Sequence, residues 1–141
     1  MEDILHIGGG TTDLTNFSSL QQFSKAAWDD VPTKPGVYVI YDLQEVIYVS
    51  MAGRNGNGNL RNRLKDHSSG QIVNMFAQYL FLDRVQFVSE KRITHPREAK
   101  AACRKYIEDR CSFTYFVTED ATDARDIENQ LKSKLKPSLN P

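Results

Sequence analysis

The chain has 141 residues, of which 40% are apolar, enough for the core of one compact domain. Its 18 basic and 18 acidic residues give a net charge of zero, so composition alone does not indicate a nucleic-acid-binding protein. No apolar run approaches the roughly 18 residues of a membrane span, and the acidic N-terminus lacks the features of a secretory signal. We therefore expect a cytoplasmic protein that does not insert into membranes. Cys103 and Cys111 match no zinc or redox spacing and are expected to be reduced and structural.

Residues 1–30 are predicted to be an N-terminal extension and residues 31–141 the main domain. Residues 1–14 show no pattern and are expected to be weakly ordered. In residues 15–28, apolar side chains recur at steps of three and four, which predicts a short helix. The prolines that follow end this helix and predict an extended entry into the first strand.

The clearest strand signal is a β-hairpin. Residues 36–42 and 46–50 are rich in β-branched and aromatic side chains, and the residues between them are expected to form the loop. Tyr38 and Tyr48 share a face of this sheet if they pair directly opposite each other, which requires a loop of odd length. A slip of one residue would separate them.

The rest of the chain alternates helices and strands. Asn59 is a plausible N-cap for a helix that Gly70 stops, and Thr94 for a later helix with Pro96 in its first turn. The other predicted elements are a short helix within 71–80, a strand at 84–89, a helix at 95–110, a strand at 113–118 and a helix at 123–135. This order predicts an α+β fold: a small central, mainly antiparallel sheet of three or four strands, flanked by helices.

Three motifs follow one another along this pattern. The first is Gly36-Val37-Tyr38, followed after nine residues by Tyr48-Val49-Ser50. The second is a helix carrying Arg63 and, four residues later, His67. The third is a late helix carrying Glu128, followed by Pro137-Ser138-Leu139-Asn140. Each motif alone is weak, but the ordered set resembles the GIY-YIG nuclease family over about residues 35–141.

The resemblance implies roles for five catalytic residues. Tyr38 and Tyr48 would face the scissile phosphate, and Arg63 would contact it. His67 occupies a position where the family has a histidine or tyrosine. Glu128 would hold the metal ion, Mg²⁺ or Mn²⁺.

Five further residues are implicated around this site. Gly36 and Asn140 are expected to brace it, and Arg54, Arg61 and Lys65 to contact nucleic acid. Arg54 could also supply a charge that the family places elsewhere.

The chemistry of phosphodiester hydrolysis suits several of these side chains. Arg63 offers a permanently charged planar fork for phosphate oxygens, although the basic residues of its helix could equally form a solvated face. Mg²⁺ often uses only one or two protein carboxylates, so Glu128 suffices, although it could also be an ordinary glutamate at the edge of a buried stripe. A phenol with a pKa near 10 is a poor base, so the group that takes the proton stays open.

The sequence therefore predicts a metal-dependent endonuclease that hydrolyses phosphodiester bonds, with DNA the expected substrate and RNA the alternative. Specificity would come from loops, a homodimer or a protein partner. Ser50 and Met51 replace a glycine and a lysine of the family pattern, which favours the rival hypothesis of a degenerate, non-catalytic nucleic-acid-binding or interaction module. A third hypothesis is a toxin or defence nuclease that acts on RNA.

Overall fold

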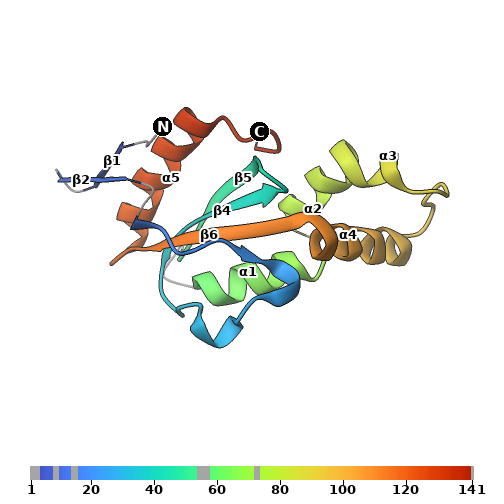
Figure 1. Cartoon of the computed structure of the whole chain (residues 1–141), viewed down its shortest axis with the longest axis horizontal. Helices are drawn as coiled ribbons and strands as arrows, with labels where there is room; N and C mark the ends of the chain where they lie inside the picture. Colours follow the sequence, from blue (N-terminus) through green and yellow to red (C-terminus); the bar gives the residue numbers. More distant parts are fainter. Residues whose placement is uncertain (1–3, 8–9, 14–15, 54–57, 72–73, 141) are drawn as a thin grey trace.

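The computed structural model describes residues 4–7, 10–13, 16–53, 58–71 and 74–140. Its main sheet has four antiparallel strands in the spatial order β3 (Gln21–Gln22), β6 (Cys111–Val117), β4 (Gly36–Asp42) and β5 (Glu45–Ala52). Helices flank this sheet (Figure 1), which confirms the predicted α+β class. Within the described ranges, none of the helices combines the length and the apolar composition needed to cross a membrane.

The helices form two layers around the sheet. Their bounds are Leu60–Ser68 for α1, Met75–Leu80 for α2, Gln86–Val88 for α3, Pro96–Arg110 for α4 and Ala121–Leu135 for α5. Figure 1 shows α5 on one side of the sheet and α1 on the other. A separate two-stranded hairpin, β1 (Ile4–Ile7) and β2 (Gly10–Asp13), lies beside α5.

Alternate side chains of β4 belong to two apolar cores, one on each face of the sheet. Val37 and Val39 pack against the apolar stripe of α5, whose buried members include Ile127 and Leu131. Side chains on the opposite face of β4 join a larger core with residues of α1, α2 and α4; this core includes Tyr38, Ile40, Leu60, Leu64, Phe76, Leu80, Cys103 and Ile107. A strand buried on both faces explains why its sequence is almost continuously apolar.

A β-bulge sets which side chains of the hairpin share a face. The register of β4 and β5 shifts between Ile40 and Tyr41, so that Ile40 pairs with Tyr48 and Tyr38 pairs with Ser50. The condition of direct pairing between the two tyrosines is therefore not met. They nevertheless face the same core, because an offset of two residues matches the period of side-chain alternation. Without the bulge, Tyr48 would lie one residue out of step and face the other side.

Among the described residues, the N-terminal segment lacks the helix predicted at residues 15–28. Residues 1–14 contain the β1–β2 hairpin, and residues 15–28 contain no α-helix among those described. Instead, β3 pairs with β6, and two short 3₁₀ turns follow it, at Phe23–Lys25 and Trp28–Asp30. Trp28 stacks on Phe113 of β6, with ring centroids 5.6 Å apart. These aromatic contacts stabilise the strand and the two turns, although the spacing of apolar residues predicts a helix.

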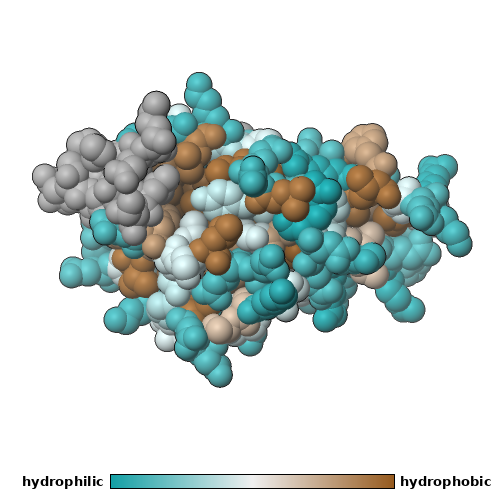
Figure 2. Space-filling model, in the orientation of Figure 1, coloured by the Kyte–Doolittle hydropathy of each residue, from teal (hydrophilic) through white to brown (hydrophobic). Residues whose placement is uncertain are grey.

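The predicted strand at 84–89 is also wrong. Here α2 continues through a π-helical turn, Phe81–Val85, into α3. This path buries Val85, which is 2% exposed, and lets Arg84 reach Asp42, with a guanidinium Nη1 to Oδ2 distance of 2.8 Å. Phe87 and Val88 stay exposed, and Figure 2 shows apolar atoms in the region of α3. Tertiary contacts thus override a local strand preference.

The N-cap of α1 agrees with its prediction, whereas that of α4 differs by one residue. Asn59 caps α1, its side chain accepting a hydrogen bond from the Asn62 N–H, as predicted. The cap of α4 is His95 rather than Thr94, since His95 Nδ1 accepts from the Arg97 N–H. Both cysteines are free and buried, and burial raises the pKa of the two thiols to about 11 and about 12.

Candidate functional site

The largest set of predicted residues meets at the outer edge of β5. Among the described strands, β5 pairs with β4 alone, so its other edge faces a cavity of about 820 Å³. Side chains from both helical layers reach around this edge. The cavity is lined by Tyr48, Ser50, Met51, Ala52, Gly53, Gly58, Asn62, Arg63, Asp66, His67, Asn74, Met75, Tyr79, Glu128, Lys132 and Asn140.

The α1 side of the cavity contains Arg63 and His67. They lie one helical turn apart and so share a face of α1. His67 is 2% exposed and packs among three rings, with centroids 5.4 Å from Tyr38, 5.9 Å from Tyr48 and 5.1 Å from Phe76. Its Nε2 lies 2.7 Å from the Tyr38 hydroxyl. Tyr38 is fully buried behind His67 and does not line the cavity.

Burial keeps these aromatic groups uncharged. Burial, together with the positive charge of Arg63, lowers the pKa of His67 to about 3. Burial also raises the pKa of Tyr38 and of Tyr48 above the ordinary value for tyrosine, although Arg63 and a hydrogen-bonding contribution from Ser50 act in the opposite direction. At neutral pH, His67 therefore resists protonation, and the two tyrosines resist deprotonation.

This electrostatic arrangement predicts a pH-dependent stability. The unfolded chain takes up a proton on His67 near pH 6.5, whereas the folded chain does so only near pH 3. The contribution of His67 to the free energy of unfolding is therefore full above about pH 6.5 and is lost as the pH falls towards 3, at up to about 1.4 kcal/mol per pH unit. Urea unfolding at a series of pH values should show a flatter slope for His67→Gln. His95→Asn, which keeps an N-cap acceptor, is the control, and a wild-type slope in His67→Gln would contradict the assignment.

The α5 side of the cavity provides Glu128, whose carboxylate is almost completely buried. Its side chain is 4% exposed, and its Oε2 has no hydrogen-bond partner in the described part of the chain. The ammonium group of Lys132 lies 3.6 Å from Oε2, one turn along the helix. A buried carboxylate oxygen without a hydrogen-bond donor is costly, which indicates that this position suits a cationic ligand.

Asn140 joins the C-terminal segment to the edge of β5. Its Oδ1 accepts a hydrogen bond from the Val49 N–H at 2.8 Å, and its Nδ2 donates to the Val49 carbonyl at 2.9 Å. The Leu139 N–H donates to the carbonyl of Ile47 at 2.8 Å. These bonds attach the C-terminal segment to β5 beside the cavity and hold Asn140 in the cavity wall.

Gly36 lies outside the cavity lining, at the start of β4. A Cβ at this position would collide with the carbonyl oxygen of Phe116 and the side chain of Leu60. The glycine therefore allows β6 and α1 to approach the strand that carries Tyr38.

Of the residues predicted to contact nucleic acid, Arg61 and Lys65 do not line the cavity. Arg54 lies outside the described residues. Arg61 bonds to the N-terminal segment instead, donating to the carbonyls of Val31 at 2.8 Å and Asp29 at 3.0 Å. Lys65 is exposed on α1 and does not line the cavity.

Sequence reasoning missed Lys132 and Asn74 as residues of the cavity. Lys132 had a usable signal, since it follows Glu128 by four residues on a predicted helix. Asn74 caps α2, accepting from the Ala77 N–H at 2.8 Å, while its Nδ2 is buried without a partner among the described residues. Nothing in the sequence points to its place in the cavity, which depends on how α2 packs.

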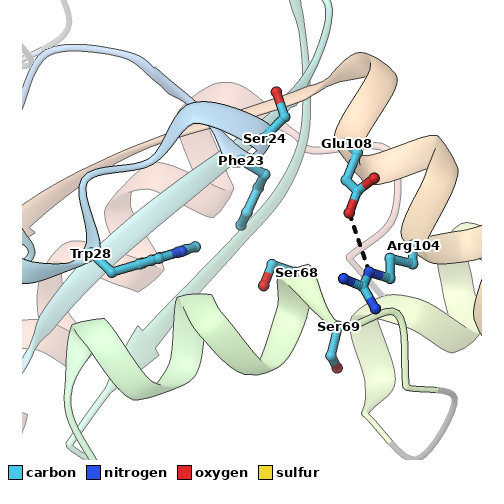
Figure 3. Close-up of a pocket in the computed structure, with 7 residues that line it drawn as sticks. All are labelled: Phe23, Ser24, Trp28, Ser68, Ser69, Arg104 and Glu108. Carbon is cyan, nitrogen blue, oxygen red and sulfur yellow. Dashed lines mark hydrogen bonds and ion pairs between the residues drawn. The ribbon is translucent and has the colours of Figure 1, made fainter.

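A second cavity, of about 500 Å³, lies between the N-terminal segment, α1 and α4 (Figure 3). Four of its polar side chains already have partners. Arg104 pairs with Glu108 at 3.2 Å, and the hydroxyls of Ser68 and Ser69 donate to carbonyls of α1 at 2.6 Å. It offers no unpaired buried group for a ligand, in contrast to the cavity at β5.

The chain was compared with known protein families, curated proteins and solved structures. No protein-family model matches the chain, and no curated protein matches it significantly. Its structure is similar to the crystal structure of the GIY-YIG N-terminal endonuclease domain of UvrC from Thermotoga maritima, a point mutant bound to its catalytic divalent cation. The two sequences are 21% identical, the match covers 81% of this chain and 90% of that chain, and the TM-score is 0.45.

Proposed function

We propose that the chain is a metal-dependent phosphodiesterase that cuts nucleic acid in the cavity at the edge of β5. One observation carries the proposal: Glu128, whose buried Oε2 has no hydrogen-bond partner among the described residues, lines the same cavity as Arg63. Such a pair can bind a cation and a phosphate next to each other. A module that only binds nucleic acid gains nothing from a buried carboxylate, which repels phosphate.

The ligand set at Glu128 suits Mg²⁺ or Mn²⁺ better than zinc. Among the residues that the structure describes, no group of three or more His, Cys, Asp or Glu side chains could hold a metal ion together. Zinc sites need three or four protein ligands, whereas Mg²⁺ keeps several waters and binds through one or two carboxylates. A divalent cation held by Glu128 would polarise the phosphate and stabilise the leaving oxygen.

The other residues of the cavity can orient the substrate. Arg63, which is exposed on α1, can donate two parallel hydrogen bonds to phosphate oxygens. Tyr48 is 8% exposed and, as a neutral phenol, can donate to the phosphate or to the attacking water. Tyr38 and His67 form a hydrogen-bonded pair behind it, which fixes the orientation of the His67 ring. The two tyrosines are held as neutral phenols, and the lowered pKa of His67 makes it a weak base, so we assign all three groups orienting roles and not the role of general base.

The first test is a cleavage assay on a panel of substrates. It would contain plasmid, linear duplex, single-stranded, flapped and branched DNA and structured RNA, each with Mg²⁺, Mn²⁺ or EDTA. We expect metal-dependent cutting, with DNA the preferred substrate. Arg63→Ala should lower kcat/KM by about a hundredfold, because a charged donor to the reacting phosphate is lost. Arg63→Lys should recover part of this loss, since it restores the charge but not the planar fork.

Lys105→Ala is the control, since Lys105 is an exposed base on α4 and lies outside the cavity. It should change cleavage little. Equal cleavage by wild type and Arg63→Ala would point to a contaminant. Binding without cutting on every substrate, unaffected by metal, would support the non-catalytic binding module instead.

A further inference from the structure

The ion pair between Glu128 and Lys132 differs from the other pairs of its kind in the described chain. Arg104–Glu108 and Lys105–Asp109 have the same i,i+4 spacing on α4 and distances of 3.2 and 3.0 Å. All four of their side chains are well exposed, as is ordinary for surface pairs. In the pair on α5, the acid is 4% exposed and the base 38%, and the two atoms are 3.6 Å apart.

This geometry compensates charge without forming a hydrogen bond. A separation of 3.6 Å is too long for one, and Oε2 indeed has no hydrogen-bond partner in the described chain. The carboxylate is fixed by its burial on α5, whereas a partly exposed lysine on a four-carbon stem can move. Lys132 can therefore leave Glu128 at little cost, provided that another cation replaces its charge.

We propose that Lys132 is a displaceable counter-ion that holds the charge of Glu128 until a divalent cation takes its place, and that then turns to the phosphodiester in the cavity. The inference rests on the proposed function in taking Glu128 as the cation site. Two cations cannot share one carboxylate oxygen without repulsion, so cation binding must move the ammonium group. The displaced ammonium stays within a cavity that Arg63 also lines, where a phosphate would attract it.

This exchange couples the two ligands. A divalent cation frees Lys132 for phosphate, and a phosphate that draws Lys132 away uncovers Glu128 for the cation. Linkage requires the two effects to be equal in free energy. Metal and nucleic acid should therefore bind with positive cooperativity that depends on Lys132.

Binding of Mn²⁺ in the absence of nucleic acid tests whether Lys132 competes with a divalent cation for Glu128. Free Mn²⁺ would be followed by electron paramagnetic resonance for wild type, Lys132→Gln, Lys132→Arg and Glu128→Gln. We expect Lys132→Gln to bind Mn²⁺ about three- to tenfold more tightly than wild type, because a competing cation worth roughly 1 kcal/mol is gone. Lys132→Arg should stay close to wild type. Lys105→Gln, which removes the base of an exposed pair, should leave the affinity unchanged, and circular dichroism would verify the fold of each variant.

Fluorescence anisotropy with a labelled, phosphorothioate single-stranded DNA tests whether the displaced Lys132 then contributes to binding of the phosphodiester. Mg²⁺ should tighten DNA binding by wild type, and Lys132→Gln should lose most of this effect. Suppose that Lys132→Gln binds Mn²⁺ no more tightly than wild type, while Glu128→Gln does not bind Mn²⁺. This result would overturn the counter-ion role of Lys132 and leave the cation site at Glu128 intact. Mn²⁺ binding that is the same in wild type, Lys132→Gln and Glu128→Gln would instead overturn the cation site of the proposed function, and the inference with it.

Discussion

Replacement of Asp42 by alanine is expected to lower the free energy of unfolding by about 3 kcal/mol, as measured by urea denaturation. The Asp42 side chain is fully buried at the end of β4. It accepts hydrogen bonds from Arg84 Nη1 at 2.8 Å, Arg110 Nε at 2.8 Å and the Tyr106 hydroxyl at 2.5 Å. Removing one partner of a buried pair costs about 3–5 kcal/mol. The lower end applies here, because Arg84 and Arg110 are 18% and 43% exposed and can be partly solvated.

Asp83→Ala is the matched control for Asp42→Ala. Asp83 also pairs with Arg84, at 3.0 Å, but its side chain is 52% exposed. Its removal should cost less than about 1 kcal/mol, as for other exposed pairs. Similar losses in the two variants would show that burial does not set the strength of this network.

The same network makes Asp42 contribute to acid unfolding in a lower pH range than His67. Burial raises the pKa of Asp42, but hydrogen bonds from Tyr106, Arg110 and Arg84 outweigh it and hold this pKa below its ordinary value. The stabilisation is therefore full above the unfolded pKa of about 3.9 and is lost as the pH falls through the folded pKa. The loss due to His67 begins about 2.6 pH units higher, near pH 6.5.

Local patterns were sufficient to predict the central elements of the fold. The β-hairpin, the cap of α1 at Asn59 and the apolar stripe of α5 follow from propensity and periodicity, which are read over a few neighbouring residues. All three appear in the structure. The α+β class follows from the order of these elements.

Features set by distant contacts could not be predicted in this way. Residues 84–89 have the composition of a strand, but residues 84–88 continue a helix, in which Arg84 binds Asp42, 42 positions earlier in the chain. Trp28 is held by stacking on Phe113, across the sheet. Such contacts depend on the packed arrangement, so a window of ten residues contains no signal for them.

The cavity at β5 combines residues whose positions follow from local patterns with residues whose positions depend on distant contacts. The four-residue step from Arg63 to His67 places both on one face of α1, as the helical period requires. The shared face of Tyr38 and Tyr48 instead depends on the bulge, which supplies the extra residue that the hairpin loop lacks. Glu128 looked like a border glutamate from its helical position, yet it is buried because α5 packs beside the edge of β5.

Glu128→Gln is expected to lower metal-dependent cleavage by about a thousandfold. The polarising effect of a metal on a phosphoryl group is worth several kcal/mol, and each 1.36 kcal/mol is a tenfold change in rate. Glutamine keeps the size of the side chain but removes the charge that would attract the cation. Because Lys132 is 38% exposed, water can solvate its ammonium group after the substitution, so the fold should be retained. Initial rates across an Mg²⁺ titration, with circular dichroism as a check on folding, would measure the effect.

Glu108→Gln isolates the effect of position from that of charge. Glu108 also follows the i,i+4 rule with a basic partner, but it is 47% exposed on α4 and remote from the cavity at β5. Its replacement should leave cleavage within about twofold of wild type, since exposed pairs contribute less than about 1 kcal/mol. If Glu128→Gln cut as fast as Glu108→Gln and remained equally sensitive to EDTA, the metal would have to bind elsewhere, and the buried carboxylate would be a structural partner of Lys132. A large loss in Glu128→Gln alone would instead mean that Glu128, buried beside β5, presents an oxygen without a hydrogen bond to a cation.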